Sequence, residues 1–196
     1  KIAAHYPQTK FAITEYYYGA GHHISGGIAQ ADVLGIFGRK GLFAATLWPL
    51  AENTEFIDAA FDMYRNCDGM GGGFSDVSIS AATSDIQNTS VYASLDRVGE
   101  NRLVIVAINK SGGPLAADVQ IAAPRRFRRA AVYQLTAATA APAKAADVGP
   151  ISRNAFAYVM PAYSLSTLVL IAESGAQIPA ILLLTGNGPR ADAAER

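Results

Sequence analysis

The glycine-rich stretch GMGGG, at residues 69–73, divides this 196-residue sequence into two parts with different patterns. Before the stretch, apolar segments of strand length alternate with segments of helical periodicity. After it, short β-compatible segments follow one another between turn residues, and none has a convincing helical period. Because glycine clusters interrupt regular structure, we expect an α/β part over residues 1–68, a flexible connector over 69–74, an all-β domain over 75–172 and a loosely held tail over 173–196.

The first part contains two strand-then-helix units. The second strand shows no polar alternation, which is typical of a parallel sheet buried on both faces. Two such units in succession indicate the C-terminal part of a TIM (β/α)8 barrel or an open α/β sheet. The expected strands are 11–14 and 42–47, and the expected helices are 24–37, with Ser25 as N-cap and Gly38 as stop, and a second helix from the cap Asn53 or Thr54 to Arg65.

The second part predicts six or seven short strands separated by turns, which is the pattern of a β-sandwich. The continuous apolar run at 103–108 is typical of a central strand. Residues 136–148 are rich in Ala and Pro and are expected to form a loop, and the segment after Ala172 has no clear partner. The expected strands are 77–81, 91–95, 103–108, 115–121, 131–135, 155–160 and 164–171.

Charge and hydropathy point to a neutral partner. The chain has 16 basic and 16 acidic residues, so its overall field gives no reason to expect nucleic acid or an anionic membrane. The basic run at 125–129 is interpreted as a solvated strand edge. The apolar run at 178–184 is far shorter than the about 20 residues that span a bilayer. The chain starts at Lys1 without Met or a signal peptide, which predicts a mature or truncated product.

The sequence gives little evidence for a metal site or for a reactive cysteine. Cys67 is the only cysteine, so an intrachain disulfide and a cysteine cluster are excluded, and we expect a half-buried structural thiol. His22 and His23 are adjacent, but no Asp, Glu or Cys stands at ligand spacing from them. We therefore expect no metal and no cofactor, and a surface role for both histidines.

Glu15 and Trp48 are the strongest candidate pair for chemistry. Glu15 closes the first expected strand and Trp48 closes the second, so in a β/α barrel both lie at the C-terminal rim, where functional groups gather. An acid beside an aromatic platform suits a neutral sugar polymer, because sugar rings present flat C–H faces to an indole. The alternatives are a solvated or capping Glu15 and a core tryptophan.

Other polar residues near this rim are weaker candidates. In an extended chain Tyr16 and Tyr18 share one side and Tyr17 takes the other, so at least one hydroxyl can bond Glu15 or a substrate hydroxyl. We expect Tyr16 and Tyr17 to bind substrate, the alternative being packing under the helix. Glu52 is either a second carboxylate of the site or an acid favoured at a helix start, and we prefer the second reading.

The segments FAITEYYYGAGHHISGGIAQADVLGIFGRKGLFAATLWPL and AFDMYRNCDGMGGGFSDVS resemble glycoside hydrolase family 44, a family of β-1,4-glucanases that includes endoglucanases and xyloglucan-active members. The likeness is close over residues 10–80 and weaker over 81–172. It implies a TIM-like barrel with a β-sandwich domain and a retaining mechanism that uses two glutamates. By this resemblance Glu15 matches the nucleophile and Trp48 an aromatic residue of the substrate cleft.

The resemblance also implies what this chain lacks. The acid/base glutamate of the family lies on a much earlier strand, and no residue here matches it, so the chain is expected to be a C-terminal fragment that is inactive alone. The implied partner is β-glucan, and the full-length enzyme is expected to be monomeric and extracellular. The alternatives are a non-catalytic carbohydrate-binding or spacer β-sandwich module and, ranked last, a nucleic-acid binder that uses residues 125–129.

Overall fold

The computed structural model describes residues 2–50, 53–99, 101–173 and 181–186. Its first part carries α1 (Ile2–His5), β1 (Ala12–Tyr16), α2 (Ile24–Arg39), β2 (Ala44–Leu47) and α3 (Glu55–Arg65). The strands that follow are β3 (Val77–Ile79), β4 (Ala81–Thr83), β5 (Thr89–Leu95), β6 (Arg102–Asn109), β7 (Leu115–Ala122), β8 (Phe127–Thr136), β9 (Thr139–Val148), β10 (Ala155–Met160), β11 (Ser164–Ala172) and β12 (Ile181–Gly186).

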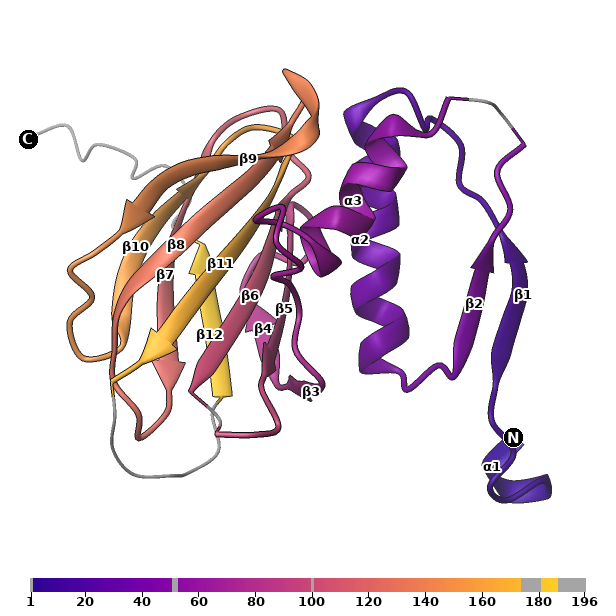
Figure 1. The fold of residues 1–196 in the computed structure, drawn as a ribbon, viewed down its shortest axis with the longest axis horizontal. Coiled ribbons are helices and arrows are strands. Elements are labelled where there is room, and N and C mark those ends of the chain that lie inside the picture. Colours follow the sequence, from indigo (N-terminus) through magenta and orange to yellow (C-terminus); the bar gives the residue numbers. More distant parts are fainter. Residues whose placement is uncertain (1, 51–52, 100, 174–180, 187–196) are drawn as a thin grey trace, which may run out of the picture.

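These elements form four layers, which Figure 1 shows side by side. The outermost layer is the two-stranded sheet of β1 and β2, and the second consists of α2 and α3. A six-stranded sheet in the order β3-β5-β6-β11-β8-β9 follows, and a four-stranded sheet in the order β10-β7-β12-β4 completes the stack. The described part is therefore mostly β, with the two long helices between sheets.

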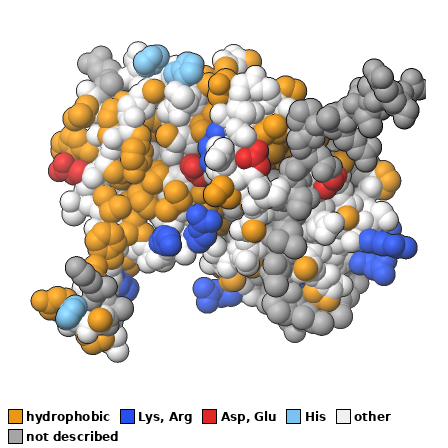
Figure 2. All heavy atoms as spheres, turned by 180° about the vertical axis from the view of Figure 1, so that it is seen from behind, with side chains coloured by type: hydrophobic (Ala, Val, Ile, Leu, Met, Phe, Trp, Pro, Cys, Tyr) orange, Lys and Arg blue, Asp and Glu red, His pale blue; other side chains and the backbone are white. Residues whose placement is uncertain are grey.

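The β1–α2–β2 unit confirms the expected strand–helix–strand order, and its two strands pair in parallel. One face of the pair packs on the helices, whereas large apolar side chains on the rest of this layer stay exposed, among them Phe11 at 52% and Phe43 at 61%. Figure 2 shows hydrophobic side chains gathered over this end of the molecule. The expectation of a sheet buried on both faces is wrong for the described residues, because none of their elements covers the outer face.

The ends of both helices differ slightly from expectation. His23, not Ser25, is the N-cap of α2, and its Nδ1 accepts a hydrogen bond from the Ser25 backbone N–H at 3.2 Å. Histidine thus takes the place that Ser usually fills. The helix runs past Gly38 to Arg39. Thr54 is the N-cap of α3, but its hydroxyl donates to the Asp58 carboxylate at 2.8 Å instead of capping the backbone.

Strand β6 confirms the prediction of a central strand. It pairs with β5 on one side and β11 on the other, and both of its faces are covered. Leu103 and Ile105 belong to the hydrophobic cluster shared with the four-stranded sheet, whereas Val106 and Ile108 belong to the cluster shared with α2 and α3. Each such buried aliphatic side chain contributes about 1.5–3 kcal/mol to folding. The apolar run without alternation is explained by this two-sided burial.

Two expectations about the β part are wrong. Residues 77–81 do not form one strand, because the chain passes at Ser80 from β3 in the six-stranded sheet to β4 in the four-stranded sheet. The expected loop at 136–148 is largely strand β9, which pairs with β8 through a tight turn at Ala137 and Ala138. Strand β9 ends the six-stranded sheet, and an edge strand tolerates a proline such as Pro142.

The tail also contradicts expectation in part. Ile181–Gly186 forms β12, which pairs antiparallel with β7 and parallel with β4. This segment was not predicted to be a strand because polar and apolar residues do not alternate along it. A strand in the interior of a sheet need not show such alternation. Residues 174–180 and 187–196 lie outside the described residues. Over the described part of the chain, no helix has the length and apolarity needed to cross a bilayer.

The glycine-rich connector is held by hydrogen bonds instead of being a loose link. The Asp68 carboxylate accepts from the backbone N–H groups of Met70 and Gly72, both at 2.8 Å, and these bonds lower the pKa of Asp68. The Gly72 carbonyl in turn accepts from the N–H of Cys67 at 2.8 Å. A carboxylate that accepts hydrogen bonds from two backbone N–H groups holds the turn in one conformation.

Cys67, which was expected to be half-buried, is instead buried next to this turn at 3% exposure, and burial raises the pKa of its thiol to about 11. At pH 8 only about one thiol in a thousand is then ionised, so the native protein should react very slowly with a thiol-specific disulfide reagent. We expect labelling at pH 8 to become fast only after unfolding in urea, as followed by absorbance. Native labelling as fast as that of free cysteine would contradict this assignment of a structural thiol.

Candidate functional site

The carboxyl ends of β1 and β2 form the rim where the sequence places its candidate residues. Ile13 is in register with Ala45 and Tyr16 with Leu47, so Thr14 and Glu15 together face only Thr46. This two-against-one pairing is a β-bulge, a feature that re-aims side chains and is common beside active sites. The bulge leaves Glu15 exposed. Glu15 lies one residue before the strand end, not at it.

Trp48 lies at the same rim, as predicted. Its backbone N–H donates to the Tyr16 carbonyl at 3.0 Å, which places Trp48 one residue beyond Leu47, the register partner of Tyr16. The side chain of Trp48 is 57% exposed, so the core alternative does not hold for the described residues. An exposed indole next to an exposed carboxylate is the combination that a sugar ring can use.

The three tyrosines take different positions. Tyr16 points to α2, where its hydroxyl accepts a 2.8 Å hydrogen bond from the side chain of Gln30 and its ring meets Phe37 edge-on at 5.3 Å. Burial is the main cause that raises the pKa of Tyr16. Tyr17 is half-buried and Tyr18 is 56% exposed. Tyr16 therefore anchors the strand end next to the bulge.

The histidines show no arrangement for metal binding. His22 and His23 are both exposed, and the His23 ring is engaged with Ser25 as the helix cap. Among the described residues, no group of three or more His, Cys, Asp or Glu side chains could hold a metal ion. Glu52, the second carboxylate considered for the rim, lies outside the described residues.

The basic run at 125–129 leads into β8. Three of its arginines are exposed, and Arg128 pairs with Glu173 at 2.8 Å. Strand β8 lies between β11 and β9, so the run is solvated but does not mark a sheet edge. Arg125 Nε is buried without a hydrogen-bond partner in the part of the chain that the structure describes.

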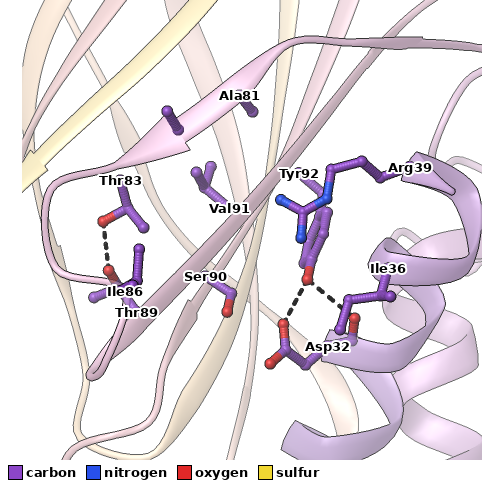
Figure 3. A pocket seen from close by; sticks show the side chains of 11 residues that line it. Asp32, Ile36, Arg39, Ala81, Thr83, Ile86, Thr89, Ser90, Val91 and Tyr92 are labelled. Atoms are coloured by element: carbon purple, nitrogen blue, oxygen red, sulfur yellow. Dashed lines mark hydrogen bonds between the residues drawn. The ribbon is translucent and has the colours of Figure 1, made fainter.

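A second polar cluster, which the sequence did not reveal, joins α2 to the six-stranded sheet (Figure 3). The Tyr92 hydroxyl donates to the Asp32 carboxylate at 2.6 Å, and Lys110 Nζ lies 3.8 Å from the other carboxylate oxygen. The Arg39 guanidinium lies over the Tyr92 ring at 5.4 Å. Asp32, Arg39 and Tyr92 border a cavity of about 410 Å³ between α2 and the β4–β5 region. The cluster joins residues from distant parts of the chain, and no local motif links them.

The cluster is a joint between layers and not a catalytic tyrosine site. Burial first, and then the hydrogen bond to Asp32, raise the pKa of Tyr92 well above its usual range. The hydroxyl thus stays protonated at neutral pH and cannot serve as a base. A further buried bond joins the same layers, from the Thr167 hydroxyl of β11 to the Met63 carbonyl of α3 at 2.8 Å, and the Tyr64 hydroxyl bonds the Ala31 carbonyl at 3.0 Å within the helical layer.

The chain is similar in sequence to bacterial glucanases. It is 40% identical over 174 residues to endoglucanase A of Paenibacillus lautus, covering 88% of this chain and 25% of that protein. It is 35% identical over 164 residues to β-mannanase/endoglucanase A of Caldicellulosiruptor saccharolyticus, covering 83% of this chain and 12% of that protein. No protein-family model matches the chain.

Solved structures agree with the sequence matches. A family 44 xyloglucanase of Paenibacillus polymyxa superposes with a TM-score of 0.84 at 34% identity, over 88% of this chain and 34% of that one. A family 44 endoglucanase of Clostridium thermocellum gives a TM-score of 0.81 at 38% identity, over 86% of this chain and 33% of that one. The sequence and structure matches thus place the chain among the glycoside hydrolases.

The family follows from the same matches. This chain belongs to glycoside hydrolase family 44, which confirms the resemblance seen in its sequence. Its mostly β fold with two long helices matches the family structures. The chain spans about a third of the length of the solved relatives and a quarter or less of the two sequence relatives.

The packing of α2 on Tyr92 of the sheet predicts that alanine substitutions at two glycines of this helix have opposite effects on stability. A Cβ on Gly35 would lie 2.4 Å from atoms of the Tyr92 ring, whereas a Cβ on Gly38 would meet nothing within 4 Å. Gly35→Ala should therefore lower the free energy of unfolding by about 1–3 kcal/mol through overpacking. Gly38→Ala, the matched control, should raise it by about 0.5–1 kcal/mol through helix propensity.

Urea unfolding of the two variants, followed by circular dichroism, measures both changes. Equal midpoints for the two variants would mean that the Tyr92 ring is not seated on Gly35.

Proposed function

We propose that this chain supplies the nucleophile side of a retaining glycoside hydrolase that cleaves β-1,4-glucan chains, with Glu15 as nucleophile. The observation that carries the proposal is the rim geometry. An exposed Glu15 at a β-bulge stands beside an exposed Trp48, joined through the Trp48 N–H bond to the Tyr16 carbonyl. The names of the relatives, endoglucanase and xyloglucanase, support the substrate class.

In the proposed reaction the Glu15 carboxylate attacks the anomeric carbon of the sugar bound at the rim. The glycosidic C–O bond breaks while a second carboxyl group, about 5 Å away in retaining enzymes, protonates the leaving oxygen. The glycosyl ester on Glu15 is then hydrolysed by water, which the second carboxylate activates. Trp48 stacks on a C–H face of the sugar and holds it in line.

Neighbouring residues have supporting roles in this proposal. Tyr16, fixed by Gln30 and Phe37, holds the strand end so that the bulge keeps Glu15 pointing outward. Tyr17, which follows it and is half-buried, contributes a hydroxyl to the bound sugar. The side chain of Tyr16 thus reaches substrate only indirectly, through the position of Glu15.

The second carboxyl group comes from outside this chain, since no residue here matches the family's acid/base. In this proposal β1–α2–β2 and α3 are the last part of a TIM barrel, and the two larger sheets form a β-sandwich domain beside it. The complete enzyme acts as an extracellular monomer on a neutral β-glucan such as the xyloglucan bound by a solved relative. The 196-residue chain alone is inactive.

The decisive experiment is mechanism-based labelling of the enzyme that contains this chain. A 2-deoxy-2-fluoro cellobioside with a good leaving group should form a stable ester on Glu15, located by peptide mass mapping. Glu15→Gln should lower kcat by at least about 10³-fold, because a nucleophile acts in every turnover. A label on any other residue would refute the assignment.

Glu55→Gln serves as the matched control. Glu55 is an exposed carboxylate in the first turn of α3, at the same end of the molecule as the rim but outside the two strands and seven residues after Trp48. Its substitution should leave kcat within about twofold, as surface changes usually do. A loss equal to that of Glu15→Gln would show that charge at this end of the molecule, and not a nucleophile, is being measured.

A further inference from the structure

The cavity between α2 and the β4–β5 region has the size and lining of a ligand site. Its volume of about 410 Å³ lies within the usual range of small-molecule sites. We propose that it binds a segment of neutral β-glucan away from the rim, as a second carbohydrate site. The choice of glucan rests on the proposed function, whereas the site itself rests on the contacts below.

The polar groups of the cavity suit a ligand that both donates and accepts hydrogen bonds. Arg39 makes no ion pair with any carboxylate of the described residues, so its N–H groups remain available at the mouth of the cavity (Figure 3). Asp32, on the same helix, offers an acceptor oxygen on the other side of Tyr92, and its charge is partly balanced by Lys110. Because a cation and an anion both border the cavity, an uncharged polyhydroxyl ligand is favoured over an anion.

Apolar and hydroxyl groups complete the lining. Ile86 is 75% exposed and Ile36 is 36% exposed, and both border the cavity beside Val91. Such aliphatic surfaces pack against the C–H faces of sugar rings. The Ser90 hydroxyl also lines the cavity, where it accepts a bond from Lys110 at 3.1 Å.

A second cavity borders the first, which favours a polymer over a single sugar. The second cavity, of about 320 Å³, shares Arg39 and Tyr92 with the first and reaches Ser78 and Ser80 near β3. Arg39 therefore borders both cavities, and the two together are called the groove. A chain of several sugar rings can occupy both halves and bond the arginine between them.

This groove is separate from the rim. Asp32 and Arg39 lie on the side of α2 that meets β5, whereas Gln30 and Phe37 lie on the side that meets β1. The rim leads into the first turn of α2, and Arg39 is in its last turn. The groove and the rim thus lie on different sides and at different ends of α2, and the two sites can be tested independently.

The test titrates the full 196-residue chain with cellohexaose while backbone amide signals are recorded by NMR. We expect saturable shifts at Ile86, Ser90 and Arg39. Arg39→Ala should weaken this binding by about tenfold or more, since hydrogen bonds from a charged group are lost. Lys40→Ala, the matched control, removes the same charge one residue away without lining either cavity, and should change affinity by less than about twofold.

Two further variants distinguish a loss of binding from a loss of folding, and binding in the groove from binding at the rim. Ile86→Ala removes an exposed side chain, cannot impair folding by emptying the core, and should also weaken binding. Trp48→Ala should abolish any shifts at the rim while those of the groove persist. Absence of shifts in the groove, or equal affinities of the Arg39 and Lys40 variants, would overturn the proposal. Labelling of Glu15 is unaffected by that result, so a failure here is distinguishable from a failure of the proposed function.

Discussion

The packing of α2 between two sheets is the constraint on which the rest of the structure depends. One side of the helix meets the β1–β2 pair, and the other side is seated on Tyr92, whose ring lies where a Cβ on Gly35 would be. The Tyr92 hydroxyl then bonds Asp32 and fixes the register of helix against sheet. Because β1 and β2 are joined through this helix, the orientation of the candidate rim is set by a contact with the β part, sixty residues further along the chain.

Much of this arrangement was accessible from the sequence, and the failures have physical causes. The strand–helix–strand unit, the central strand β6 and the shared rim of Glu15 and Trp48 follow from periodicity and from where strands end. Strand β9 was missed because Ala and Pro are both depleted in strands, and its place at a sheet edge is what tolerates them. The groove at Arg39 was missed because its residues come together only through tertiary packing, which no local pattern records.

The candidate site also shows how one strand can serve two purposes. On one side of the bulge Tyr16 is tied to Gln30 and Phe37, and on the other Glu15 is left free in solvent. A regular strand would turn Glu15 to the same face as Ile13, so the extra residue is what leaves both Thr14 and Glu15 exposed before the anchored Tyr16. Rigidity immediately beside a reacting group limits the misplacement that makes catalysis inefficient.

The exposed outer layer has a consequence for the behaviour of the chain in water. Within the described residues β1 and β2 have only each other as hydrogen-bonded neighbours, so each carries one row of backbone donors and acceptors that protein does not pair. Exposed aromatic side chains such as Phe11 and Phe43 flank those rows. Open strand edges with apolar flanks recruit further strands. The ribbon that presents the rim is therefore also the surface most prone to self-association, and dilution governs how long the chain stays monodisperse.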